Sequence, residues 1–188
     1  MTPRTLIATG LVAGLLLGVS GAEAAPKTLD GKKVTTLSFT AVAPPQANDA
    51  TAMQNDLDSV ERVTCGPPLC AFMDFVYKPA KGVKATGLLF ESSWAAPAGT
   101  DIDLYVASVD KRGDAFQLAA CGASAGTHER LYVPASAFKA GKTYRMIAYI
   151  YRSVGETVTT KVTFNAPNSV PTTVPTEAEA AAPINCGL

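Results

Sequence analysis

The chain has 188 residues, 47% of them hydrophobic, with 16 basic and 16 acidic side chains and so no net charge. This balance argues against nucleic acid or an anionic membrane as the main partner, because those contacts need clustered Lys and Arg. The length suits one domain with a sizeable core, which we expect to be a monomer.

Residues 1–24 have the features of a Sec-type signal peptide. Arg4 supplies a positive start, residues 6–19 form an apolar run, and Ala22-Glu23-Ala24 places small residues at a cleavage site. The apolar run is shorter than the ~20 residues that a membrane-spanning helix needs. We therefore predict cleavage after Ala24 and a secreted, extracellular product of 164 residues.

Short segments with period-two alternation follow, rich in Val, Thr, Tyr and Phe and separated by Gly, Pro and Asp clusters. They predict an all-β fold, an antiparallel β-sandwich of about eight strands, since no helical repeats lie between them. The predicted strands cover residues 34–41, 71–77, 84–92, 101–108, 117–121, 130–133, 143–152 and 157–164. Residues 143–152 and 157–164 are predicted to form a hairpin, and residues 50–60 either a short helix or a loop.

The segment 101–108 alternates most clearly. Ile102, Leu104 and Val106 face one way, while Asp101, Asp103 and Tyr105 face the other. The pattern predicts one dry and one wet face.

All four cysteines, Cys65, Cys70, Cys121 and Cys186, lie in the exported part. An even count in an oxidising compartment predicts two disulfides, with three possible pairings. In one of them Cys65 closes a small loop with Cys70, and Cys121 holds Cys186. Their scattered spacing argues against a zinc site.

The composition divides the exported part in two. Residues 25–165 are predicted to form the sandwich domain. Residues 166–188 are rich in Pro, Thr and Ala, which is typical of an extended tail, and end near Cys186.

Three aromatic residues are candidates for a ligand-binding surface. Trp94 follows a predicted strand, and Tyr149 and Tyr151 share one face of another. Flat rings there could hold a sugar or a protein partner if that face is open, and the alternative is that they are core or interface plugs.

Two weaker patterns offer other functions. Gly122-Ala-Ser-Ala-Gly126 matches the G-x-S-x-G nucleophile elbow, with His128 nearby, but the elbow needs a helix after Ser124, and the sequence there is β-like. The loop between Cys65 and Cys70 contains Pro67 and Pro68 and, if braced by a disulfide, has the architecture of a protease inhibitor. A serine hydrolase and an inhibitor are therefore the alternatives.

The stretch Gly99-Thr-Asp-Ile-Asp-Leu-Tyr-Val, followed by Ala140-Gly-Lys-Thr-Tyr, resembles the bacterial pre-peptidase C-terminal (PPC) domain. This resemblance implies a jelly-roll-like sandwich that accompanies secreted enzymes as a non-catalytic accessory. It also implies calcium as the one cofactor to consider, with Asp101 and Asp103 as metal ligands, since calcium takes carboxylate oxygens. The alternative is that both carboxylates lie on the solvent face of an edge strand.

Taken together, these patterns predict a secreted, non-catalytic binding or accessory module. Its expected partner is an extracellular polysaccharide, the cell wall or a secreted protein.

Overall fold

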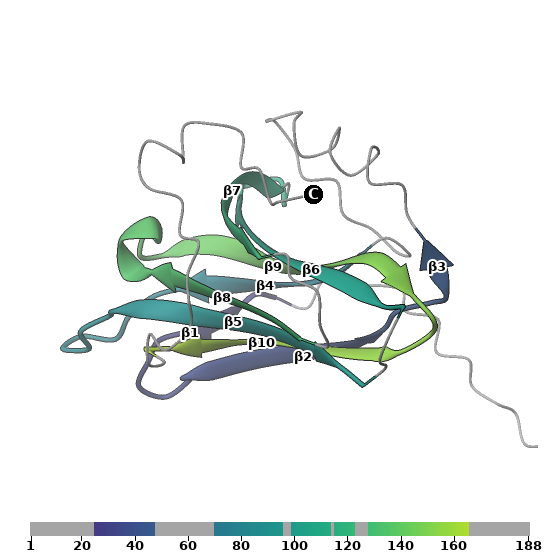
Figure 1. The fold of residues 1–188 in the computed structure, drawn as a ribbon. Helices are drawn as coiled ribbons and strands as arrows, with labels where there is room; N and C mark the ends of the chain where they lie inside the picture. Colours follow the sequence, from purple (N-terminus) through teal and green to yellow (C-terminus); the bar gives the residue numbers. More distant parts are fainter. Residues whose placement is uncertain (1–24, 48–69, 96–98, 114, 123–127, 166–188) are drawn as a thin grey trace, which may run out of the picture.

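The structure is a computed structural model that describes residues 25–47, 70–95, 99–113, 115–122 and 128–165. In this part of the chain, two β-sheets pack face to face (Figure 1). Sheet A has the strand order β1-β4-β9-β6-β7, with β3 paired to one end of β9, and sheet B has the order β2-β10-β5-β8. The strands are β1 (Lys27–Leu29), β2 (Thr36–Val42), β3 (Gln46–Ala47), β4 (Cys70–Tyr77), β5 (Gly87–Trp94), β6 (Asp101–Val109), β7 (Ala115–Gly122), β8 (His128–Pro134), β9 (Lys142–Ser153) and β10 (Thr157–Phe164).

The eight predicted strands are all present, with ends that differ by up to three residues. Two further strands, β1 and β3, were not predicted, because three and two residues are too short to show a periodicity. β1 also pairs with β4 in parallel, so sheet A is not purely antiparallel. The predicted helix or loop at 50–60 lies outside the described residues.

The predicted hairpin of residues 143–152 and 157–164 is wrong. β9 pairs with β4 and β6 in sheet A, whereas β10 pairs with β2 and β5 in sheet B. The link at 153–156 therefore carries the chain from one sheet to the other. Alternation identifies a strand by its two faces, but it says nothing about which strand lies beside it.

A buried carboxylate holds this crossover. The hydroxyl groups of Ser153 and Thr100 both donate to Glu156, with Ser153 Oγ 2.6 Å from Glu156 Oε2. The backbone N–H of Ala43 donates to the Glu156 carbonyl at 2.8 Å. Burial would raise the pKa of Glu156, but the hydrogen bonds to its carboxylate outweigh burial and lower that pKa. Glu156 thus ties three separate segments together, through its carboxylate and its backbone carbonyl.

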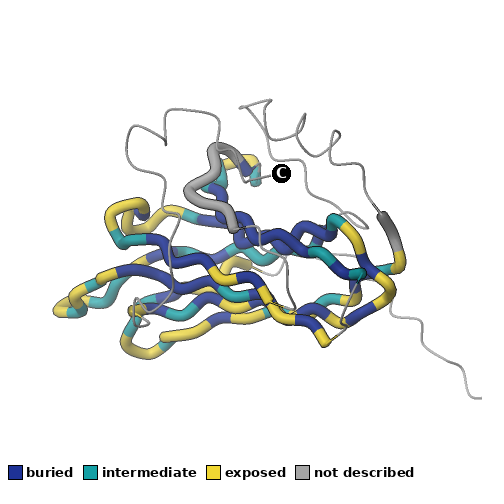
Figure 2. The backbone as a smooth tube through the Cα atoms, viewed as in Figure 1, coloured by how far each residue is buried: buried dark blue, intermediate teal, exposed yellow. Residues whose placement is uncertain are grey.

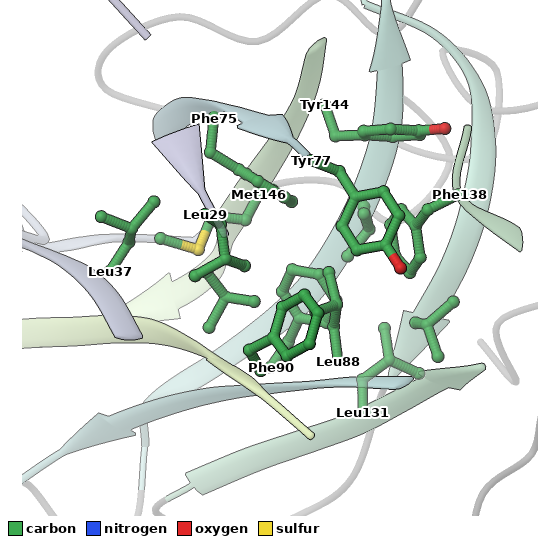
Figure 3. Close-up of a cluster of buried hydrophobic side chains, with 14 of the residues drawn as sticks. Leu29, Leu37, Phe75, Tyr77, Leu88, Phe90, Leu131, Phe138, Tyr144 and Met146 are labelled. Carbon is green, nitrogen blue, oxygen red and sulfur yellow. The ribbon is translucent and has the colours of Figure 1, made fainter. Parts of the chain in front are cut away.

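The core between the sheets is rich in aromatic rings (Figure 3). Phe138 packs against Tyr144 and Tyr77, with ring centroids 4.8 and 5.2 Å apart. Phe90 of sheet B lies 6.1 Å from Phe75 of sheet A, so the rings join the two layers. Such contacts add to the free energy gained by removing apolar surface from water.

The predicted wet face of residues 101–108 is also wrong. β6 is not an edge strand, because it lies between β9 and β7. Asp103 and Tyr105, on the face turned away from the core, are each only 2% exposed. Figure 2 shows that most of β6 and β9 is buried. Both faces of sheet A are therefore dry around these strands.

The core predicts a large cost for truncating Phe90, which is fully buried. We expect Phe90→Ala to lower the free energy of unfolding by about 3–5 kcal/mol, because it removes ring contacts and leaves a cavity. Urea unfolding measures this, with Val154→Ala as the control, since Val154 is 62% exposed and should change stability by less than about 0.5 kcal/mol. Equal effects of the two substitutions would contradict this packing.

The crossover predicts a pH-dependent effect of Glu156→Gln. A lowered pKa means that the carboxylate stabilises the fold above its unfolded pKa of 4.5 and loses this contribution as pH falls through the folded value. We expect the variant to lose about 1–3 kcal/mol at neutral pH and to approach the unsubstituted protein at low pH. Unfolding curves at several pH values test this, and a deficit that does not change with pH would contradict it.

Candidate functional site

The predicted aromatic surface is mostly closed. Trp94 lies at the end of β5, is 6% exposed, and packs in a buried cluster with Ile102 and Ile150. Within the described structure its indole N–H has no hydrogen-bond partner. Trp94 therefore has the position of a core plug, which is the alternative that the sequence left open.

The tyrosine face of β9 is covered as well. Tyr149 is 9% exposed and packs edge-on against Tyr105, with ring centroids 6.2 Å apart. Tyr151 is half-buried and is the extra residue of a bulge opposite β6. Of the three predicted ligand-binding aromatic residues, Tyr151 alone offers appreciable surface to solvent, and binding by these residues stays a prediction.

An ion pair on the same face of sheet A explains part of this burial. Arg145 donates to both carboxylate oxygens of Asp74, at 2.6 and 2.8 Å, and its guanidinium lies 3.9 Å from the centre of the Phe72 ring. It also donates to the Gly113 carbonyl at 3.2 Å. A bidentate pair held this closely orders the face and leaves little polar surface for a ligand.

The predicted metal ligands differ in their surroundings. Asp101 is half-buried at the start of β6, whereas Asp103 is buried and accepts a hydrogen bond from the Tyr105 hydroxyl at 3.2 Å. Burial, followed by the charges of Asp101 and Glu129, raises the pKa of Asp103 to about 7, although the Tyr105 bond acts in the opposite direction. β6 is an interior strand and Asp103 is buried, so the alternative of a solvent face on an edge strand is wrong for Asp103.

A metal needs more ligands than this pair. Among the described residues, no group of three or more His, Cys, Asp or Glu side chains is arranged to hold an ion. Calcium binding at Asp101 and Asp103 therefore stays a prediction.

The structure describes the side chain of only one of the four cysteines, Cys70. Cys70 begins β4 and is 3% exposed, and no described cysteine is a free thiol. The structure does not describe Cys65, Cys186 or the side chain of Cys121, so the pairing stays a prediction. The proposed inhibitory loop lies in the same undescribed region.

The nucleophile-elbow alternative lacks its structural context. Gly122 ends β7, and His128 begins β8, so a strand follows the motif where the hydrolase fold needs a helix. His128 is exposed and lies opposite Ser93 of the neighbouring strand β5. Ser124 itself lies outside the described residues.

The open polar surface lies on sheet B, on the side away from the core. Its centre is β10, where Thr157 and Thr159 are exposed while Val158 and Thr160 are buried. Exposed hydroxyl side chains continue on the neighbouring strands at matching positions, for example Thr40 of β2 and Ser93 of β5, which flank Thr159. We call this surface the hydroxyl face and define it as Thr36, Ser38, Thr40, Ser93, Thr157 and Thr159.

The geometry of the hydroxyl face follows from the pleat. Neighbouring strands lie about 4.8 Å apart, and side chains on one face repeat about every 6.8 Å along a strand, so the hydroxyl groups form a regular array. Thr40 Oγ1 and Thr159 Oγ1 are 3.3 Å apart, within hydrogen-bond distance. Beside them Glu91 accepts from Arg130 at 3.0 Å and from Lys161 at 2.9 Å, so one negative charge lies between two positive ones.

Sequence reasoning missed the hydroxyl face, although one signal was present. The alternation of residues 157–164 indicated an outward row of threonines. It could not show that Thr36, Ser38 and Thr40 lie beside that row, because β2 and β10 are more than one hundred residues apart in the chain.

Comparisons with known proteins give a partial likeness among the solved structures. No family model and no curated protein matches the chain. Among solved structures it is similar to the pre-peptidase C-terminal domain of the collagenase from Bacillus anthracis, with a TM-score of 0.42 and 11% identity over 73% of this chain and 93% of that one. The two strand motifs resemble this same family. In the described residues, no helix has the length and hydropathy to cross a membrane.

The raised pKa of Asp103 predicts an unusual pH dependence. The folded state holds this proton more tightly than the unfolded chain, whose carboxyl titrates near 3.8. The contribution of Asp103 to the free energy of unfolding is therefore greatest at low pH and falls as the pH rises from about 4 to 7. Above pH 7 this contribution is lower than at low pH by up to about 4 kcal/mol. Asp103→Asn should remove this fall, so the variant should be the more stable protein at pH 8. Denaturant unfolding at several pH values measures this. If the free energies of unfolding of the two proteins change in parallel with pH, the prediction is contradicted.

Proposed function

We propose that this protein is a secreted, non-catalytic binding module whose hydroxyl face holds an extracellular, uncharged polysaccharide. The observation that carries the proposal is the array of six exposed hydroxyl side chains on three adjacent strands of sheet B. In this proposal the cysteines form two disulfides, and the signal peptide directs export.

The chemistry of the face favours a sugar polymer. Each Ser or Thr hydroxyl both donates and accepts, which matches the hydroxyl groups of a polysaccharide. The face carries only one uncompensated positive charge, because Glu91 lies between Arg130 and Lys161. A strongly anionic or cationic ligand would therefore gain little from charge complementarity.

The strand at the centre of the face is paired on both sides. β10 is paired along its length with β2 on one side and β5 on the other. The backbone that carries its outward side chains is therefore ordered before any ligand arrives, and less conformational entropy is lost on binding. A flat, ordered surface of this kind suits an extended polymer better than a small molecule, which prefers a concave pocket.

A secreted protein is the second partner class, and the β2 edge of sheet B is the place where such a partner would add a strand. A serine hydrolase lacks support because β8 follows the motif containing Ser124. An activity-based serine probe separates these classes, since labelling at Ser124 would overturn a non-catalytic module.

A pull-down on insoluble polysaccharides and bacterial cell walls tests the proposal. We expect the protein to be retained on at least one matrix. The double variant Thr40→Val with Thr159→Val should bind that matrix about tenfold more weakly, because each substitution removes a hydroxyl group and keeps a β-branched side chain. Thr28→Val is the matched control, because Thr28 is exposed on β1 of the other sheet. The same pull-down, repeated with a chelator, tests whether retention needs calcium at Asp101 and Asp103. Retention that the double variant leaves unchanged, or no retention on any matrix, would contradict the proposal.

A further inference from the structure

The free edge of β2 differs from the other sheet edges in the described structure. An edge strand is normally protected from pairing by charge, proline, a bulge or shortness. β1 has three residues, β7 has register shifts against β6, and β8 carries Arg130 and ends at Pro134. β2 has seven residues, Thr-Leu-Ser-Phe-Thr-Ala-Val, with none of these protections and an unbroken register against β10.

The hydrogen bonds at the two ends of β2 show which backbone groups point outward. The N–H of Ala43 donates to the Glu156 carbonyl, and the N–H of Phe164 donates to the Thr35 carbonyl, both at 2.8 Å. Bonding alternates along an antiparallel strand, so the odd-numbered residues of β2 face β10. The N–H and C=O groups of Thr36, Ser38, Thr40 and Val42 therefore point to the free edge, where no described strand pairs with them.

We propose that the β2 edge pairs with β2 of a second copy of this chain, in antiparallel orientation about a two-fold axis at Phe39. In this register Thr36 lies opposite Val42 of the second copy, and Ser38 lies opposite Thr40. All four outward-facing residues of each copy are then bonded, as the antiparallel ladder requires. The two copies of sheet B become one continuous sheet, which also joins their hydroxyl faces.

Two observations favour a second copy over another extended peptide. Residues 34–48 contain no charged side chain, so the edge can meet itself without like-charge repulsion. Phe39 and Ala41 are only half-buried on the core side of β2. At the two-fold axis Phe39 would pack against Phe39 of the second copy, which removes further apolar surface from water. A dimer differs from the monomer that we expected from the sequence, and it does not depend on the polysaccharide.

Sedimentation velocity from micromolar to millimolar concentration tests the dimer. We expect a weak, concentration-dependent dimer, because an edge-to-edge contact buries little surface. Ser38→Pro should raise the dissociation constant at least about tenfold, since it removes an outward N–H from each copy without removing a bond to β10. Ser38→Ala is the control at the same position, because it keeps the N–H and should associate as before.

A second variant keeps the test decisive if the proline variant does not fold. Ser38→Lys places two lysines near the two-fold axis and should also weaken association, whereas Thr159→Lys, on the same face of a strand paired on both sides, should not. Circular dichroism verifies that each variant is folded. An unsubstituted protein that stays monomeric at every concentration, or a folded Ser38→Lys variant that associates normally, overturns the proposal.

Discussion

The architecture depends on the passage of the chain from sheet A to sheet B at residues 153–156. β9 and β10 are interior strands of their respective sheets, so this link joins the two layers at their interior. Buried Glu156 holds the link by accepting from Ser153 and Thr100 while its carbonyl accepts from Ala43. The alternation of β10 starts directly after it, with Val158 inward and Thr157 and Thr159 outward. The crossover therefore also determines which side chains form the hydroxyl face.

The two sheets use their outer faces differently. On sheet A, the outer side of β6 and β9 is dry and occupied by internal contacts, including the Arg145–Asp74 pair and the bond from Tyr105 to Asp103. Burial raises the pKa of Asp103, so its carboxylate opposes stability at neutral pH. On sheet B, the outer side of β2 and β10 is open and polar. The open face is the better candidate for an extracellular ligand.

Much of the fold could be predicted because alternation records which side chains leave water. Val158 and Thr157 on β10 behave as the pattern indicates. The same rule failed on β6, where Asp103 and Tyr105 suggested a solvent face and are instead buried on an interior strand. Sequence alternation measures the polarity of a side chain, and it cannot report that another part of the molecule covers that side chain.

Pairing was the other quantity that the sequence could not supply. The predicted hairpin failed because neighbouring strands in sequence belong to different sheets. The candidate site shows the same limit, since the aromatic residues Trp94 and Tyr149 are conspicuous in sequence but buried in the fold. The hydroxyl face and the β2 edge both arise from the long-range pairing of β2 with β10.

In the proposed function sheet B, and not sheet A, presents the binding surface. Backbone chemical shifts of the labelled protein, followed while soluble oligosaccharide fragments of a retained polysaccharide are added, locate that surface. We predict that shift changes concentrate at Thr40, Ser93 and Thr159. Changes that concentrate instead at Tyr149 and Tyr151, with sheet B unaffected, would contradict it.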